Sequence, residues 1–312
     1  MKIVNIHHPI DDDFRNDAKV VLAMGYFDGI HLGHQEVINR AKEIANQKHL
    51  PLAVLTYDHK PAVVYKQLSP HERRNIIMND EKMKFMESMG VDKVFLVNYS
   101  FNFQNQTPQE FVDNYLIKFN VDTVVAGSDH TYGAKDATMD LLPKYAKNRF
   151  DVVSVDLKKF KYEKVSSTRI RRNLDDGHIK TVNELMGRPF HTVGTVVHGL
   201  ARGRKLGYPT ANIEHDELQW LPAIGIYVVN VHIGNDIYHG MASIGRNVTF
   251  GNSNPITVEI NLLDFDNNIY GEVVGIDWLY RIRGEVKFEG VDKLIEQLKD
   301  DEDFTRMFFK NN

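Results

Sequence analysis

Two histidines lie three residues apart in the segment GYFDGIHLGH, residues 25–34, directly after the apolar run VVLAM. A strand that turns into a helix leaves unpaired backbone amides and the positive end of the helix dipole at the turn, which suits a phosphate group. The glycines of the segment let the backbone approach a ligand closely. His31 and His34 add hydrogen-bond donors, and each imidazole can take up a positive charge beside a phosphate that becomes more negative. The spacing therefore favours a site that holds a polyphosphate during nucleotidyl transfer. Taken alone, the four-residue HxGH match also fits two solvated or metal-binding histidines in a turn.

A second set of chemically active side chains lies after residue 200. Glu259 interrupts the otherwise apolar start of the run ITVEINLLDF, and a carboxylate in such a place can accept the proton of an attacking hydroxyl. The run PTAN, residues 209–212, offers the hydroxyl of Thr210 and the side-chain carbonyl of Asn212, which are hard oxygen ligands of the kind that Mg²⁺ takes. On pattern alone, a solvent-facing strand glutamate and a glycine-rich hairpin that ends in a proline turn stay open as interpretations.

The elements that must position the histidines alternate between short apolar runs and longer amphipathic ones. We expect strands at about 19–24, 51–57, 92–97, 121–126 and 150–155, separated by helical segments. This alternation predicts a mostly parallel sheet with both faces covered and with ligands bound beyond the carboxyl ends of its strands, where GYFDGIHLGH falls.

Two local patterns support the helical segments. Five apolar residues recur at helical spacing after the histidine motif and predict one buried helix face: Val37, Ile38, Ala41, Ile44 and Ala45. The run TPQE, residues 107–110, predicts a capping box at a helix start.

The pattern changes after about residue 185. Glycines become frequent among short β-rich runs such as HTVGTVVH, GIYVVNVHI, ITVEINLLDF and NIYGEVVGIDWL, which predicts a small antiparallel barrel or sandwich. A final helix should place one apolar face, Val291, Leu294, Ile295 and Leu298, against that sheet. We therefore expect two domains, residues 1–185 and residues 186–312, of class α/β followed by class β.

Composition narrows the class of protein. The 312 residues are 42% hydrophobic and 26% charged, which is typical of a globular chain. With no Cys, the chain has no disulfide, no thiolate nucleophile and no cysteine-ligated metal. The formal net charge of -4 argues against a general nucleic-acid binder, and no segment approaches the length of a membrane helix. The expected location is the cytoplasm.

Several motifs in a fixed order now resemble one family. GYFDGIHLGH resembles the nucleotide-binding turn of the nucleotidylyltransferases with an HxGH signature, and within them of the bacterial bifunctional riboflavin kinase/FMN adenylyltransferases, also called FAD synthetases. AGSDHTYG at 126–133 and VSSTRIRRNL at 165–174 are similar to further motifs of that family. In the second half, residues 194–213 resemble its flavokinase signature, and residues 258–272 resemble the strand that carries its catalytic glutamate.

For the first half the resemblance implies a Rossmann-like domain that transfers AMP from ATP to FMN. Three side chains would stabilise charge on the phosphates, with Mg²⁺ helping: His31, His34 and Arg169. ATP would be bound by Gly25, Phe27, Asp28, Gly33, Ser167 and Thr168. Asp129 would position the flavin, although Asp28 and Asp129 are each also explained as turn caps. Residues 158–173 carry seven Lys or Arg against one Glu, and most of these charges besides Arg169 should be solvated.

For the second half the resemblance implies a β-barrel riboflavin kinase with a C-terminal helix, which phosphorylates riboflavin with ATP. Glu259 would be the base, and Thr210 and Asn212 would bind Mg²⁺. Three glycines would shape the phosphate loop for ATP: Gly199, Gly203 and Gly207. The substrates and products are thus ATP, riboflavin, FMN and FAD, with no nucleic acid or membrane as partner, and the sequence names no protein partner.

The first half departs from the family pattern at two places. The chain reads YDHKP at 57–61, where the family usually has Phe, an acid, Pro, His and Pro, and His130 stands where an aromatic residue is expected. Both departures lie where FMN should bind. They keep open a riboflavin kinase whose adenylyltransferase half is weak or takes another substrate. A flavin-binding regulator without turnover and another kind of adenylyltransferase are the remaining alternatives, and the PTAN domain argues against the last.

Overall fold

The chain folds into two compact units in a computed structural model, residues Met1–Ser167 and Thr168–Asn312. The structure describes residues 1–133, 137–199, 203, 207–246 and 256–311. The boundary expected between residues 185 and 186 falls inside the second of these units, and it stays a prediction.

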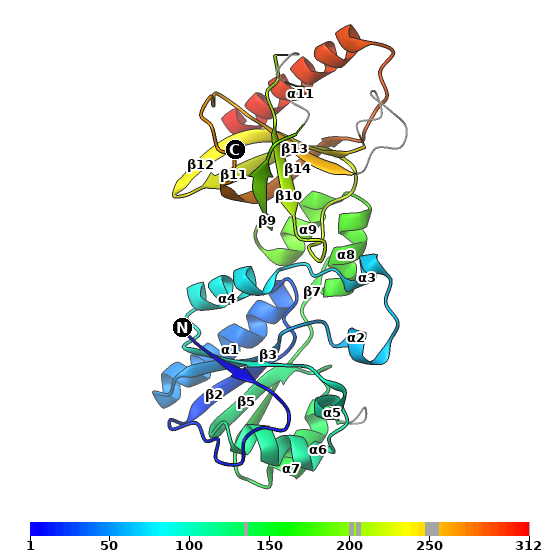
Figure 1. The fold of residues 1–312 in the computed structure, drawn as a ribbon. Helices are drawn as coiled ribbons and strands as arrows, with labels where there is room; N and C mark the ends of the chain where they lie inside the picture. The colour runs from blue at the N-terminus through cyan, green and yellow to red at the C-terminus, as the bar shows by residue number, and fades with distance from the viewer. Residues whose placement is uncertain (134–136, 200–202, 204–206, 247–255, 312) are drawn as a thin grey trace. The chain divides into compact units, whose positions relative to one another are not determined.

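The first unit is built on a six-stranded parallel sheet in the order β1-β4-β3-β2-β5-β6 (Figure 1). Its strands are β1 (Lys2–Ile6), β2 (Val20–Met24), β3 (Leu52–Tyr57), β4 (Lys93–Val97), β5 (Val121–Gly127) and β6 (Asp151–Val155). The five strands predicted for this half are confirmed to within one residue at each end. β1 was not predicted, because it is a short edge strand in which only Ile6 is fully buried, so its sequence carries little apolar signal.

Helices cover both faces of this sheet, as predicted. They are α1 (Leu32–Lys48), α2 (Ala62–Tyr65), α3 (Pro70–Arg73), α4 (Asn79–Ser88), α5 (Phe101–Gln104), α6 (Pro108–Phe111) and α7 (Leu142–Ala146), with a π-helix at Val112–Ile117 and a 3-10 turn at Met139–Leu141. Figure 1 shows α1 and α4 on one side of the sheet and α6 and α7 on the other. The capping box at 107–110 is confirmed, with Thr107 and Glu110 each accepting from the other's backbone amide.

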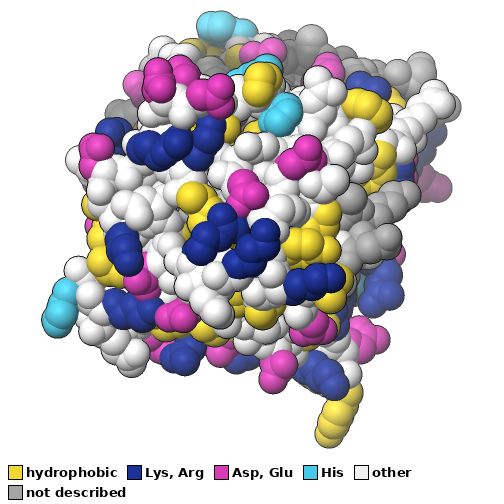
Figure 2. Space-filling view, turned by 90° about the horizontal axis from the view of Figure 1, so that it is seen from below, with side chains coloured by type: hydrophobic (Ala, Val, Ile, Leu, Met, Phe, Trp, Pro, Cys, Tyr) yellow, Lys and Arg dark blue, Asp and Glu magenta, His cyan; other side chains and the backbone are white. Residues whose placement is uncertain are grey.

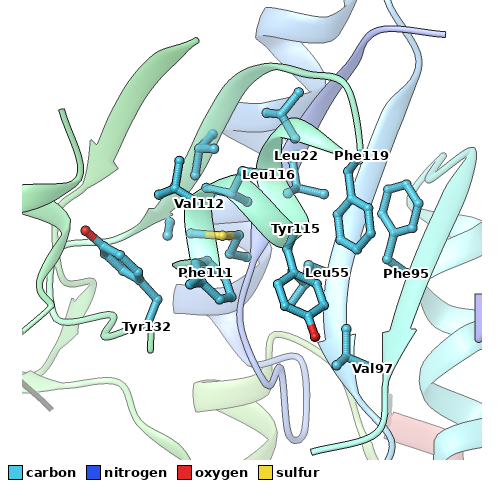
Figure 3. Packing of buried hydrophobic residues seen from close by; sticks show 14 of the residues in the cluster. Leu22, Leu55, Phe95, Val97, Phe111, Val112, Tyr115, Leu116, Phe119 and Tyr132 are labelled. Atoms are coloured by element: carbon cyan, nitrogen blue, oxygen red, sulfur yellow. The ribbon is translucent and has the colours of Figure 1, made fainter. Parts of the chain in front are cut away.

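Alternate residues of the central strands feed two separate cores. The five predicted residues of α1, from Val37 to Ala45, are all buried against one face, together with Val21 and Ala23 of β2. The opposite face packs Leu22 of β2 in a cluster with the aromatic side chains Phe111, Tyr115 and Phe119, as Figure 3 shows, and the rings of Phe95 and Phe119 stack there with centroids 3.9 Å apart. The parallel strands are therefore apolar on both sides, which is why they appear in the sequence as continuous apolar runs.

The second unit contains a closed six-stranded antiparallel barrel in the order β10-β13-β12-β11-β14-β9. Its strands are β9 (Phe190–Val197), β10 (Ala211–His215), β11 (Gly225–Ile233), β12 (Asp236–Gly245), β13 (Thr257–Leu262) and β14 (Val273–Arg283). Two helices precede it, α8 (Ser167–Asp175) and α9 (Ile179–Met186). A two-stranded hairpin of β7 (Lys159–Phe160) and β8 (Glu163–Lys164) comes before them, near the end of the first unit. The predicted barrel is confirmed, while β10 and β12 were not predicted.

The predicted C-terminal helix is α11 (Val291–Asn311), which contacts β11 and β12 of the barrel. Leu294 and Leu298 turn toward the interior of the unit, as expected, where they line a pocket. Val291 is 47% exposed, so the predicted apolar face was wrong at the first turn of the helix.

The surface mixes both signs of charge. On the face drawn in Figure 2, Lys and Arg side chains lie interspersed with Asp and Glu. Within the part of the chain that the structure describes, no helix is both long and apolar enough to cross a membrane.

Candidate active sites

A pocket of about 410 Å³ lies at the carboxyl ends of the parallel strands in the first unit. The strand order reverses between β2 and β5, since the chain runs outward from β2 through β3 and β4 on one side and from β5 to β6 on the other. Ligands of open α/β sheets bind at such a reversal. Eight of the predicted site residues line this pocket: Gly25, Phe27, Asp28, His31, Gly33, His34, Asp129 and Ser167.

The two histidines of the HxGH motif are stacked at the beginning of α1. His31 is the N-cap of the helix, and its side-chain Nδ1 accepts a hydrogen bond from the backbone N–H of His34 at 3.3 Å. The two imidazole rings have centroids 3.6 Å apart, and the ring of Phe27 packs edge-on against His34 at 5.4 Å. Both imidazoles are thus held in fixed orientations at the positive end of a helix of 17 residues, where an anion is stabilised.

Asp28 uses its carboxylate to hold the backbone of the same pocket. Its Oδ1 accepts from the amides of Ile76 at 2.8 Å and Ile77 at 3.3 Å, and the side chain is buried. Its backbone carbonyl accepts from the hydroxyl of Ser167 at 2.9 Å, which ties the start of α8 to the histidine motif. These contacts hold a segment 48 residues away in the sequence, whereas the turn cap and the contact with ATP that were expected of Asp28 both stay predictions.

The second motif of the first unit places an ion pair and a buried imidazole in the pocket. The carboxylate of Asp129 pairs with the ammonium group of Lys164 on β8. Burial lowers the pKa of His130 to about 4, so that this side chain is neutral near pH 7. Its Nε2 atom has no hydrogen-bond partner among the described residues. The position at which the sequence departs from the family therefore presents a neutral polar group to the pocket.

Tyrosines that the sequence analysis did not single out form another wall. Tyr57, Tyr65 and Tyr99 line the pocket, and the rings of Tyr57 and Tyr99 meet edge to face with centroids 4.7 Å apart. Burial raises the pKa of Tyr99 to about 12, so its hydroxyl stays protonated. A group of aromatic side chains of this kind can pack against a planar ring system. The only signal in the sequence was that Tyr57 ends a strand and begins the altered YDHKP run.

Thr168 and Arg169 follow Ser167 in α8 and belong to the second compact unit. Arg169 is half-buried, and its backbone carbonyl accepts from the side chain of Asn173. Their predicted roles in binding the phosphates of ATP stay predictions.

A larger pocket, of about 630 Å³, lies in the second unit. Thr210, Asn212 and Glu259 all line it, although 49 residues separate Thr210 from Glu259 in the sequence. Asn212 of β10 stands directly opposite Glu259 of β13 in the antiparallel register. The hydroxyl of Thr210 donates to Glu259 Oε2 at 3.2 Å, and the hydroxyl of Thr257 donates to Oε1 at 3.4 Å.

Two described glycines before PTAN, Gly199 and Gly203, lie close to these residues. A Cβ atom on Gly199 would lie 2.1 Å from Nδ2 of Asn212, so a larger residue would displace that side chain. Gly203 also lines the pocket, and a Cβ atom there would lie 2.2 Å from the carbonyl oxygen of Tyr208. Gly207 is exposed with a φ of 82°, which favours glycine. Residues 200–202 and 204–206 of the predicted phosphate loop lie outside the described residues.

An ion pair between β14 and α11 forms part of the wall of the same pocket. Arg283, at the end of β14, donates from Nη2 to Asp301 of α11 at 2.5 Å and from Nε at 2.9 Å. Asp301 is only 1% exposed, and both residues line the pocket. Neither residue was predicted from the sequence, because Asp301 lies in the acidic run DDED, which is typical of a solvated helix face.

The side chains of the second pocket fit a divalent cation bound to nucleotide phosphates. Thr210 and Asn212 offer a hydroxyl and an amide oxygen, and the Glu259 carboxylate adds negative charge beside them. Hard oxygen ligands of this kind, completed by phosphate oxygens and water, are what Mg²⁺ prefers. The donor set therefore agrees with the predicted Mg²⁺ site.

Two family models match the chain, FAD synthetase over residues 13–169 and riboflavin kinase over residues 186–309. A bifunctional riboflavin kinase/FMN adenylyltransferase from Listeria monocytogenes is 44% identical over 310 residues, which cover 99% of this chain and 98% of the relative. One from Bacillus subtilis is 36% identical over 315 residues, which cover 100% and 99% of the two chains. A solved structure from Streptococcus pneumoniae, called a macrolide-efflux protein, is 39% identical with a TM-score of 0.90 and covers 97% of this chain and 99% of that one. None of the motifs in either half accounts for the efflux name, whereas the two family models agree with those motifs in order and position.

Proposed function

The chain belongs to the family of bifunctional riboflavin kinase/FMN adenylyltransferases, and on that premise we propose that its two halves catalyse successive steps of FAD synthesis. The second half phosphorylates riboflavin with ATP and yields FMN and ADP. The first half transfers AMP from a second ATP to FMN and yields FAD and pyrophosphate. The product of the second pocket is thus the substrate of the first.

In the kinase step, the ribityl 5′-hydroxyl of riboflavin attacks the γ-phosphorus of ATP. A bond forms between that oxygen and phosphorus, the bond to the β–γ bridging oxygen breaks, and ADP leaves. The hydroxyl must lose its proton, and Glu259 is the carboxylate that takes it, because it lies within the pocket beside the candidate phosphate ligands. Thr210 and Thr257 donate to its two oxygens and fix its orientation.

Thr210 and Asn212 would hold the Mg²⁺ ion that accompanies ATP, and such an ion supplies positive charge that stabilises the transferring phosphoryl group. The close contact between Gly199 and Asn212 keeps the amide in place. Gly199 and Gly203 supply the backbone of a loop that follows the phosphates, and the exposed Gly207 supplies its turn.

In the adenylyl transfer step, a phosphate oxygen of FMN attacks the α-phosphorus of ATP, and pyrophosphate leaves. The nucleophile is already an anion, so the site acts by alignment and by charge stabilisation and requires no general base. His31 and His34 face the phosphates from the beginning of α1, and Arg169 adds a guanidinium group. Ser167 and Thr168 add hydroxyl donors.

The flavin ring of FMN packs against the tyrosine wall of the first pocket, while Asp129 and Lys164 lie at its polar side. His130 stands in the same pocket in place of an aromatic residue. This substitution favours a second candidate function, in which the kinase is efficient and the adenylyltransferase is weak or takes an altered substrate.

The observation that carries the proposal is that each half brings most of the residues of its own motifs into one pocket, even where they are far apart in the sequence. ATP labelled at the γ-phosphorus and ATP labelled at the α-phosphorus test the assignment directly, with riboflavin as the other substrate. FMN should carry only the γ label, and FAD should carry both labels. FAD that lacks the γ label would contradict a pathway through FMN made by the same chain.

We place this activity in the cytoplasm as part of the same proposal. ATP and flavins are small cytoplasmic metabolites, and a chain without Cys requires no oxidising compartment for folding.

A further inference from the structure

Three potential metal ligands lie on the outer face of the barrel, apart from both pockets. His191 is in β9, Asp277 in β14 and His232 in β11, and these three strands are neighbours in the barrel order. Asp277 stands directly opposite His191 in the register of β14 with β9, and His232 stands opposite Gly275, two residues earlier on β14. All three side chains are therefore on one face of the sheet.

The alternation of burial shows that this face is the outer one. In β14, Ile276 and Trp278 are fully buried in the barrel interior, while Asp277 between them is half-buried. The side chains of His191 and His232 are 29% and 36% exposed. Ions and small ligands can thus reach the group from solvent.

The ligand atoms already converge. Nδ1 of His191 lies 2.7 Å from Oδ1 of Asp277, and Nε2 of His232 lies 2.7 Å from Oδ2 of the same carboxylate. Two nitrogens and a carboxylate oxygen, one from each residue, lie within 4.8 Å of one another. Ligands around a tetrahedral ion with bonds of about 2.0 Å lie roughly 3.3 Å apart, so small side-chain rotations suffice to surround an ion.

Gly275 makes room for this arrangement. A Cβ atom at that position would lie 2.7 Å from Cε1 of His191 and 3.5 Å from Cβ of His232. A larger residue at position 275 would push the imidazole of His191 away from Asp277. β14 therefore places a carboxylate at Asp277 and leaves room at Gly275, so that the imidazoles of His191 and His232 both fit beside the carboxylate.

We propose that His191, His232 and Asp277 form a binding site for a divalent transition-metal ion, with zinc as the fitting ion. Two imidazole nitrogens and one carboxylate are the ligand set of three-ligand zinc sites, which leave the fourth position to water. Mg²⁺ does not match, because it prefers a shell of oxygen atoms. The site is distinct from the Thr210 and Asn212 pair, since its three residues are not among those that line the second pocket.

An ion at this site would cross-link β9, β14 and β11 of the barrel. Without metal, Asp277 accepts hydrogen bonds from both imidazoles and also interacts electrostatically with the guanidinium group of Arg188. With metal, each imidazole would bind the ion through the nitrogen that faces the carboxylate and would carry its proton on the other ring nitrogen. The ion would bind the folded barrel and not the unfolded chain, which raises the stability of the second unit.

Titration with Co²⁺, whose visible absorption reports nitrogen and oxygen ligands in a four-coordinate site, tests the proposal. The full chain is used without a histidine tag, stripped of metal by EDTA and kept free of nucleotide, which would chelate the probe. Absorption should saturate at one equivalent of Co²⁺ and disappear when Zn²⁺ is added. In His232→Ala and Asp277→Asn, the dissociation constant for Co²⁺ should rise at least about tenfold.

The control variant is His178→Ala, which removes an exposed histidine that precedes α9 and should bind Co²⁺ as the parent does. The variant His31→Ala shows how much of the Co²⁺ absorption comes from ions bound to His31 and His34 in the first unit. Zn²⁺ should also raise the thermal unfolding midpoint of the parent and leave the two variants of the triad unchanged. Circular dichroism and riboflavin phosphorylation with Mg²⁺ check that the variants are folded. Equal Co²⁺ binding by the parent and the triad variants, or a parent that gives no absorption change, would overturn the proposal and leave a hydrogen-bonded cluster.

Discussion

The hydroxyl of Thr210 lies 3.2 Å from a carboxylate oxygen of Glu259, although the two residues are 49 positions apart in the sequence. One is a candidate magnesium ligand, and the other is the candidate base. Their contact places the group that would remove a proton directly beside the site that would hold the ATP phosphates. The antiparallel pairing of β10 with β13 creates this arrangement, because it sets Asn212 opposite Glu259.

The variant Glu259→Gln should lower the rate of FMN formation from riboflavin by about a hundredfold or more, since general-base catalysis contributes that much. The amide keeps the size of the side chain and can still accept from Thr210, so the fold should not change. FAD formation from supplied FMN should stay near the parent rate. Measurement of both reactions on one preparation checks the prediction, and a kinase rate close to the parent's would remove Glu259 as the base.

Two variants of His31 separate its catalytic role from its structural one. His31→Ala should reduce FAD formation from FMN about a hundredfold through loss of charge stabilisation, and it should also cost about 1 kcal/mol through loss of the N-cap. His31→Asn keeps a side chain that can cap α1, so it should retain stability and still lose the activity. Steady-state rates and urea unfolding are compared for both. If His31→Asn were as active as the parent, His31 would be a cap and not a catalytic residue.

Substitution of Asp28 should lower the stability of the fold. Its buried carboxylate satisfies the amides of Ile76 and Ile77, and Asp28→Ala would leave them without that acceptor. The expected loss is about 1–3 kcal/mol in the free energy of unfolding, followed by far-UV circular dichroism in urea. Asp129→Ala, which removes only an exposed ion pair with Lys164, is the matched control and should change stability by less than about 1 kcal/mol. If Asp28→Ala were as stable as this control, the hydrogen bonds from Ile76 and Ile77 to Asp28 would contribute little to the free energy of unfolding.

Lowering the pH should reduce the free energy of unfolding of the first unit because of His130. Its pKa in the folded chain is lowered to about 4 from 6.5, so between these values the unfolded chain binds a proton that the folded chain does not. The free energy of unfolding therefore falls as the pH is lowered from 6.5 to 4. In His130→Phe, which fills the pocket without a titrating group, this part of the fall should be absent. Urea unfolding of both chains across that pH range gives the comparison, and parallel curves would contradict the assigned pKa.

The strands of the first half were predictable because each is a continuous apolar run that packs against helices on both faces. Leu22 and Ala23, for example, face opposite cores. β1 escaped prediction because an edge strand with one buried side chain leaves no such run. β10 escaped because PTAN and the residues after it are half-exposed pocket residues, whose types reflect ligand binding more than burial.

The candidate sites were predictable where a motif is local, as in GYFDGIHLGH, and less so where the fold brings distant residues together. The tyrosine wall comes from β3, α2 and the residues after β4, and the pair of Arg283 and Asp301 joins β14 to α11. No periodicity in a single sequence links such residues. The triad of His191, His232 and Asp277 is of the same kind, since only the barrel register makes the three strands adjacent.

One time course tests the central claim most directly. The purified chain is incubated with riboflavin, ATP and Mg²⁺, and riboflavin, FMN and FAD are separated by chromatography at intervals. The account predicts that FMN rises first and then gives way to FAD, because the two pockets act in series. FMN that accumulates without FAD would contradict the activity assigned to the first pocket and direct attention to His130 and the YDHKP run. Riboflavin that stays unchanged would contradict the account as a whole.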